Sequence, residues 1–118
     1  MRHEPSFLKD ILSACRKIEA IVEATSENSF LNDEVLPAAV LHHLTVIGEA
    51  ISCLSVELRE RYPEVPWRQI IAVRHRIVHA YFDLDWQIVW DASIDDIPGL
   101  RRQILNILTT EFSETESD

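Results

Sequence analysis

The chain has 118 residues, of which 47% are hydrophobic and 26% are charged, so we expect one domain with a packed core rather than two domains. Its formal net charge of −9 argues against a general nucleic-acid binder, because Lys and Arg normally supply most of the nonspecific affinity for phosphate. Residues 1–10 are polar, and no apolar run approaches the roughly 18 residues of a membrane span. We therefore expect a cytoplasmic protein without membrane association.

Glycine is rare and the apolar residues recur at helical spacing, which predicts an all-α chain, an up-and-down bundle of four or five helices. We expect this bundle to occupy residues 1–112 as a single domain, with 113–118 as an acidic, disordered tail. The first helix is expected over residues 6–24, with Ser6 as a possible N-cap, and residues 25–29 as a connection.

The second helix is predicted to run from about Asn32 or Asp33 to about Arg61, a length of about 40 Å. Its far side is not uniformly polar, since Leu41, Val46 and Cys53 face away from the main apolar stripe. This pattern indicates a second contact surface, for which a dimer interface is the simplest use. Cys53 and Cys15 lack metal-type spacing, so we expect two reduced thiols in the core.

Residues 62–66, Tyr-Pro-Glu-Val-Pro, end the second helix and begin the third, because each proline disfavours helix in the residue before it. Asp83 or Asp85 is a candidate cap for a fourth helix, and Asp95 or Asp96 for a fifth. Three tryptophans fall at helical spacing beside aliphatic residues, so they are expected in the core rather than as stacking platforms for bases: Trp67, Trp86 and Trp90.

The third helix carries cationic and imidazole side chains in an apolar stripe. Arg74 lies at the centre of a band formed by Trp67, Ile70, Ile71, Ile77 and Val78, where an unpaired charge costs several kcal/mol or more. Arg74 therefore either pairs with a buried carboxylate such as Glu49 or reaches an anion. Arginine binds phosphate with a planar fork, and the flanking His75 and His79 suit proton transfer near neutral pH. The second alternative predicts phosphate chemistry.

A local basic segment accompanies this helix. Five arginines and only two acids, Glu60 and Glu64, lie between Arg59 and Arg76, whereas acids dominate most of the rest of the chain. The segment is either an ordinary solvated helix face or a local RNA contact. The acidic balance elsewhere suits a basic protein partner.

The segment resembles the Arg-x4-His-x-Tyr motif of the HepT-like proteins of the HEPN superfamily, read here as Arg74, His79 and Tyr81. The similarity covers about 7–108, and His75 stands where relatives most often carry Asn. It includes the blocks Ile47-Gly48-Glu49-Ala50, Tyr62-Pro63-Glu64-Val65-Pro66-Trp67, Tyr81-Phe82-Asp83-Leu84-Asp85 and Val89-Trp90.

The resemblance implies a homodimeric, HEPN-like, metal-independent endoribonuclease toxin acting on tRNA or mRNA without a cofactor. Arg74 would hold the scissile phosphate and His79 would move a proton, with His75, Arg76 and Glu49 as auxiliary residues. Arg74 and His79 are about 140° apart around a helix, so we expect the second subunit to help complete the cleft.

The resemblance further implies that Tyr81 accepts AMP from a cognate nucleotidyltransferase antitoxin, which silences the toxin. The competing hypothesis is a noncatalytic helical subunit that binds nucleotide or substrate for such a nucleotidyltransferase. Metal binding by His75, His79 and Asp83 is a further alternative from their i, i+4, i+8 spacing, but no other Cys or His completes that site and none is expected to hold a metal.

Overall fold

The computed structural model describes residues 3–79 and 85–112, and all side chains within these ranges except those of 74–79. The described residues form seven helices and no strand, which confirms the all-α prediction. Their order along the chain is α1 (Glu4–Glu23), α2 (Glu27–Leu31), α3 (Leu36–Ser52), α4 (Val56–Arg61), α5 (Trp67–His79), α6 (Trp86–Asp95) and α7 (Ile97–Glu111).

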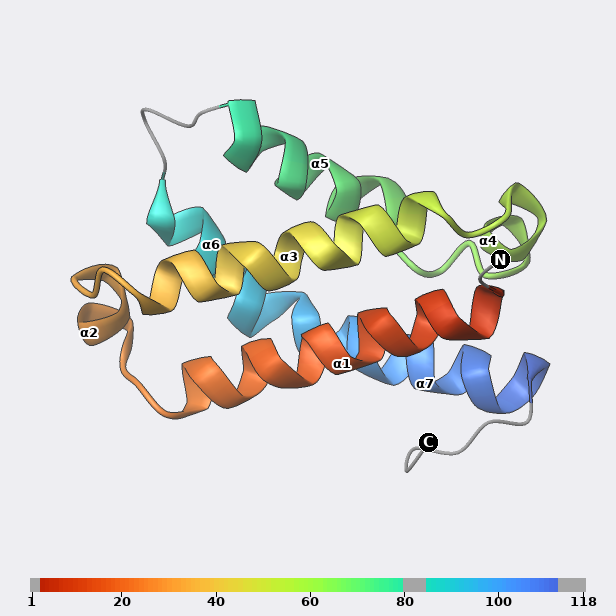
Figure 1. Ribbon diagram of the computed structural model, residues 1–118, viewed down its shortest axis with the longest axis horizontal. Coiled ribbons are helices and arrows are strands. Elements are labelled where there is room, and N and C mark those ends of the chain that lie inside the picture. Colours follow the sequence, from red (N-terminus) through yellow and green to blue (C-terminus); the bar gives the residue numbers. More distant parts are fainter. Residues whose placement is uncertain (1–2, 80–84, 113–118) are drawn as a thin grey trace.

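Five long helices make up the bundle, and α2 and α4 are single short turns at opposite ends of α3 (Figure 1). Helix α3 packs against α1 on one flank and against α5 on the other, while α6 and α7 cover α1 from behind. The core is largely aliphatic, and Phe30 and Trp67 are its buried aromatic residues. Its largest fully buried side chains are Leu8, Ile11, Ile18, Phe30, Ile47, Ile51, Leu58, Ile97, Leu100, Ile104, Ile107 and Leu108.

The predicted second helix of about 28 residues is wrong, because the chain breaks between α3 and α4. Ser55 begins a new helix by accepting a hydrogen bond from the Leu58 amide at 3.1 Å. The carboxylate of Glu4, far away in the sequence, accepts the Ser55 N–H at 2.6 Å. Leu54 and Leu58 are both buried on either side of the break, so the apolar spacing continues although the helix does not.

The start of the chain also differs from expectation. Helix α1 begins at Glu4, with His3 at the N-cap position and a proline in the first turn, so Ser6 lies inside the helix and does not cap it. The predicted connection over 25–29 contains α2, which Ser26 caps by accepting the Ser29 N–H at 3.2 Å. Phe30 of α2 is fully buried and packs against Trp90, with ring centroids 5.1 Å apart.

Of the caps predicted for α6 and α7, only the first forms a side-chain hydrogen bond. Asp85 caps α6 by accepting the Gln87 N–H at 3.0 Å, which confirms one of the two predicted choices. Asp96 stands at the N-cap position of α7 without a side-chain cap hydrogen bond, and the proline in the first turn of α7 supplies the start instead. Asp83 and the predicted tail over 113–118 lie outside the described residues.

Candidate functional site

The start of α5 is fixed to the end of α4 by a tryptophan. Trp67 is 7% exposed, and its indole Nε1 donates to the carbonyl oxygens of Tyr62 at 3.1 Å and of Arg59 at 3.2 Å. The Ile70 amide donates to the Pro66 carbonyl at 3.1 Å, so the helix begins directly after the second proline, as predicted. The helix that carries the sequence motif therefore has a defined origin.

The structure places four of the predicted site residues in one element. Arg74, His75, Arg76 and His79 belong to α5, which ends at His79. Their side chains lie outside the description, as does Tyr81 altogether, so the roles given to these residues stay predictions. The apolar residues at the start of the helix behave as the stripe predicts, since Ile70 and Ile71 are partly buried against the core.

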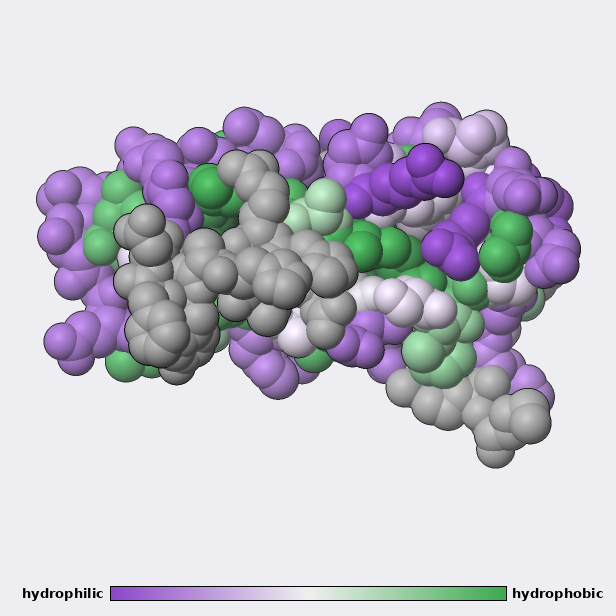
Figure 2. Space-filling view, turned by 90° about the horizontal axis from the view of Figure 1, so that it is seen from above, coloured by the Kyte–Doolittle hydropathy of each residue, from purple (hydrophilic) through white to green (hydrophobic). Residues whose placement is uncertain are grey.

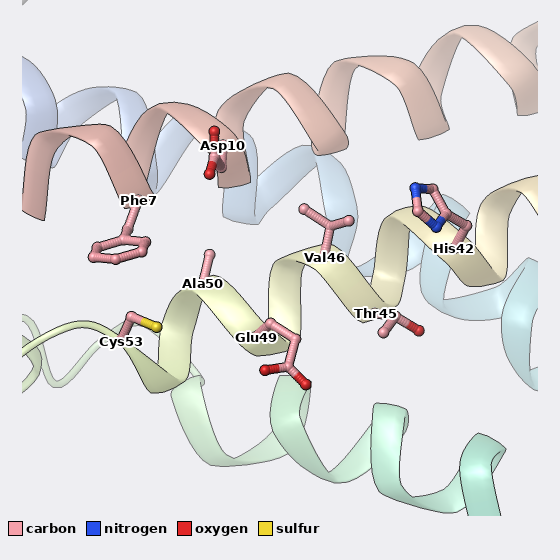
Figure 3. Close-up of a pocket in the computed structure, with 8 residues that line it drawn as sticks. All are labelled: Phe7, Asp10, His42, Thr45, Val46, Glu49, Ala50 and Cys53. Atoms are coloured by element: carbon pink, nitrogen blue, oxygen red, sulfur yellow. The ribbon is translucent and has the colours of Figure 1, made fainter. Parts of the chain in front are cut away.

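Glu49 lies on α3, the helix beside α5, and its carboxylate extends toward α5 (Figure 3). It is an exposed residue, so the prediction of Glu49 as a buried carboxylate is wrong. Glu49 is exposed because it lies on the outward-facing side of α3, in the same stripe as His42 and Cys53.

A cavity of about 300 Å³ opens along this outward stripe, between α1 and α3 (Figure 3). Half-buried apolar side chains, including Phe7 and Val46, form part of its wall, and Asp10 and Glu49 bring two carboxylates to it. Sequence reasoning missed the contribution of α1, because a helical pattern shows which face is apolar but not which helix it meets. The one sequence feature that pointed to α1 was the aromatic residue Phe7 near its start, which is half-buried in the structure.

A smaller cavity of about 140 Å³ continues the first toward the other end of α1. It shares Asp10, His42 and Val46 with the first cavity and adds Lys17 and His43. His42 is exposed and His43 is half-buried, with their rings 5.3 Å apart. Burial lowers the pKa of His43, and His42 and Lys17 lower it further, so the neutral imidazole is favoured there.

The described residues contain no group of three His, Cys, Asp or Glu side chains that would hold a metal ion. The alternative metal site at His75, His79 and Asp83 lies outside the described side chains. The three tryptophans are in the core or packed against it, as predicted. The prediction of two core thiols holds only for Cys15, because Cys53 is exposed at the end of α3.

Burial raises the pKa of Cys15 to about 12, with Glu19 acting in the same direction. Arg101 opposes this shift and donates from its Nε to the Glu19 carboxylate at 2.8 Å. This partly buried ion pair joins α7 to α1 on the side away from α5. Among the helices in the described ranges, none is long and apolar enough to cross a membrane.

The fold and the motif-bearing α5 define an all-helical protein of HEPN type, and comparison with known proteins gives the family. A family model described as Ribonuclease HepT-like matches residues 11–107, a span that includes the whole motif. The chain belongs to the HepT-like ribonuclease family.

Relatives of similar length support this assignment. The chain is 34% identical over 111 residues to "Putative RNase TTE0752" of Caldanaerobacter subterraneus subsp. tengcongensis, covering 94% of this chain and 99% of that protein. It is 33% identical over 100 residues to "Probable ribonuclease HepT" of Thermococcus cleftensis, covering 85% and 91%. It is 32% identical over 112 residues to "Putative RNase MJ0127" of Methanocaldococcus jannaschii, covering 95% and 93%. No solved structure matches the chain significantly.

Proposed function

We propose that this protein is a metal-independent endoribonuclease, the toxin of a toxin–antitoxin pair, which cleaves tRNA or mRNA in the cytoplasm. The observation that carries the proposal is the family match over residues 11–107, which includes Arg74, His79 and Tyr81. The net charge of −9 restricts RNA contact to a local surface, and the arginine-rich segment from Arg59 to Arg76 supplies one around α5.

The proposed reaction is an internal transesterification of RNA. The 2′-oxygen forms a bond to the adjacent phosphorus, the bond from phosphorus to the 5′-oxygen breaks, and His79 moves a proton from the nucleophile or to the leaving oxygen. Arg74 binds the phosphate and stabilises the charge that develops on it. The products are a 2′,3′-cyclic phosphate, or the 3′-phosphate after hydrolysis, and a 5′-hydroxyl, so no oxidant or metal enters the balance.

The proposed active form is a homodimer. Arg74 and His79 are five residues apart on one helix, about 140° around its axis, so residues from two subunits complete one cleft more readily than residues from one. The exposed stripe of α3 lies beside α5, and Glu49 extends from it toward that helix. Glu49, His75 and Arg76 are auxiliary groups of this cleft.

The proposed control of activity is covalent. A partner nucleotidyltransferase directs the Tyr81 hydroxyl to the α-phosphorus of ATP, where a bond from oxygen to phosphorus forms and pyrophosphate leaves with loss of the hydroxyl proton. The added phosphate places negative charge close to the anion-binding Arg74 and blocks RNA from it. The remainder of the chain is acidic, and this composition suits a basic partner surface.

The proposal is tested by incubating the purified protein with total tRNA in EDTA and sequencing the fragments. We expect discrete fragments, each with a 5′-hydroxyl at the new end, and growth arrest when the chain is expressed alone. Intact tRNA, or fragmentation that requires a divalent metal ion, would contradict the proposal. Intact RNA together with tight binding to the nucleotidyltransferase would instead favour a noncatalytic subunit.

A further inference from the structure

The turn that joins α4 to α5 encloses a cavity of about 410 Å³. A single stretch of chain, from Pro63 to Gln69, lines it. Its volume lies within the range of about 300–1,000 Å³ that is usual for small-molecule sites. On the side of the molecule that carries α5, hydrophobic side chains border strongly hydrophilic ones between the grey residues and the right-hand end, where α4 and α5 meet (Figure 2).

Hydrogen bonds hold this turn in one shape. The Val65 amide donates to the Tyr62 carbonyl at 3.1 Å, and the Trp67 amide donates to the Val65 carbonyl at 2.8 Å. The side-chain amide of Gln103 on α7 donates to the Glu64 carbonyl at 3.2 Å, which ties the turn to the bundle. The two prolines of the turn have fixed φ angles. The cavity is therefore formed before a ligand binds, so binding requires little further ordering of the chain.

The lining of the cavity combines apolar surface with a few polar groups. Val65 and Trp67 are almost fully buried, and the rings of two prolines add further apolar surface. Three exposed polar side chains complete the lining: Glu64, Arg68 and Gln69. Apolar walls with a small number of donors and acceptors are typical of a site that binds a flat, polar ring.

Glu64 and Arg68 bring one negative and one positive charge to the cavity, so its lining carries no net charge. Among the residues that the structure describes, neither of these two side chains forms an ion pair or a hydrogen bond. A phosphate group would meet the Glu64 carboxylate as well as the Arg68 guanidinium, and like charges repel. A nucleobase, which has donors and acceptors along its edges, can use both groups.

Guanine is the base whose edges match these two groups. Its O6 and N7 atoms accept a forked pair of hydrogen bonds from arginine. Its N1–H and N2–H groups are adjacent donors, which the two oxygens of one carboxylate can accept together. Uracil has carbonyl oxygens on both sides of its single N–H, and adenine and cytosine each have an acceptor nitrogen beside the amino group. A carboxylate therefore meets a repulsive atom on each of these three edges.

The cavity lies on the same face of α5 as the predicted catalytic histidine. In the described part of the helix, Arg68, Gln69 and Ala72 are exposed, and their positions define its outward face. His79 follows Arg68 by about three turns of helix, which places it about 20° from Arg68 around the axis and about 16 Å further along. One RNA strand that lies along this face can reach both positions.

We infer that the cavity from Pro63 to Gln69 is a subsite for an unpaired guanine of the RNA substrate, with Arg68 on the O6/N7 edge and Glu64 on the N1/N2 edge. Proteins read unpaired RNA bases by stacking and by hydrogen bonds along these edges. At about 3.4 Å per stacked nucleotide, the guanine lies no more than about five nucleotides from the scissile phosphate. The inference rests on the proposed ribonuclease function and adds a sequence preference to it.

Binding without cleavage is the first test. The full-length His79→Ala variant in EDTA is titrated with two short fluorescent RNAs, one of uridines only and one with a single central guanosine. Fluorescence anisotropy gives each dissociation constant. We expect the guanosine to tighten binding by about 5- to 150-fold, which is the discrimination of a good forked contact to a base. With Arg68→Ala or Glu64→Gln added, the protein should bind both RNAs alike.

Cleavage of RNA of random sequence is the second test. Fragments made by the parent should show guanine enriched at one fixed position within about five nucleotides of the cut. Arg68→Ala and Glu64→Gln should lose most of this enrichment and still cut. Arg102→Ala and Glu57→Gln are the matched controls, because they make the same changes at exposed positions that do not line the cavity, and they should keep the enrichment. Circular dichroism should show every variant to be folded.

Three results in the binding test would overturn the inference. These are equal affinity of His79→Ala for the two RNAs, a guanine preference that survives both cavity substitutions, and an equal loss of affinity for both RNAs in Arg68→Ala, which would indicate a phosphate contact. A guanine preference in binding together with intact RNA in the cleavage assay refutes the proposed function and leaves the subsite standing. Cleavage without guanine enrichment supports the ribonuclease and removes the subsite.

Discussion

The indole nitrogen of Trp67 donates a hydrogen bond to the carbonyl oxygen of Tyr62 at 3.1 Å and shares its proton with a second carbonyl, that of Arg59. This contact joins the first residue of α5 to the last turn of α4 and to the residue after it. It fixes where the motif-bearing helix begins, and through the helical repeat it fixes the position of every later residue on α5.

We expect Trp67→Phe to lower the free energy of unfolding by about 1–3 kcal/mol. The substitution keeps an aromatic ring at this position, but the part-buried carbonyl oxygens of Arg59 and Tyr62 lose their hydrogen-bond donor. Urea unfolding followed by circular dichroism measures this change. Trp90→Phe is the matched control for loss of ring size, since Trp90 packs against Phe30. An equal or larger loss for Trp90→Phe would show that the Trp67 hydrogen bonds contribute little.

The two cysteines should differ sharply in reactivity. Cys15 is buried with its pKa raised to about 12, so almost none of it is thiolate at pH 8, whereas Cys53 is exposed. Iodoacetamide at pH 8 should add one group to the native protein, at Cys53, and two groups to the protein in urea. Intact-mass spectrometry of dilute protein measures the additions, with Cys53→Ser as the control that removes the native reaction. Comparable rates at the two cysteines in the native protein would contradict the buried position of Cys15.

Regulation through Tyr81 predicts a gain of mass. The cognate nucleotidyltransferase with ATP and magnesium should increase the mass of the protein in units of AMP and silence its ribonuclease activity. Tyr81→Phe should keep the activity and escape silencing, because the ring remains while the acceptor oxygen is absent. Intact-mass spectrometry that shows Tyr81→Phe modified as fully as the parent would place the acceptor elsewhere.

Much of the fold could be predicted from the sequence, because local residues such as prolines and N-caps mark where several of the long helices begin. The prolines of residues 62–66 mark the start of α5, and Asp85 marks the start of α6 with a local cap. The break between α3 and α4 could not be predicted in this way. It depends on the Glu4 carboxylate reaching the Ser55 amide across 51 positions of sequence, while Leu54 and Leu58 keep the helical spacing intact.

The candidate site could likewise be predicted only in part. The motif residues Arg74, His79 and Tyr81 were found through resemblance, and their roles remain predictions because their side chains are outside the description. The cavity between α1 and α3 was not foreseen, because it is formed by the packing of two helices that are separated in the chain by α2. A pattern of residues shows a helix face, but the neighbour of that face is decided by the tertiary fold.

Cleavage of tRNA by His79→Ala, measured in EDTA against the parent, tests the central claim of a metal-independent ribonuclease most directly. Acid–base groups typically contribute about 10²- to 10⁴-fold, so we expect a loss of at least about 100-fold with the fold and the dimer preserved. The control is His3→Ala, which removes an exposed histidine that makes no side-chain cap at the start of α1 and should cleave like the parent. Undiminished cleavage by His79→Ala would remove this histidine from the reaction and with it the mechanism proposed for the chain.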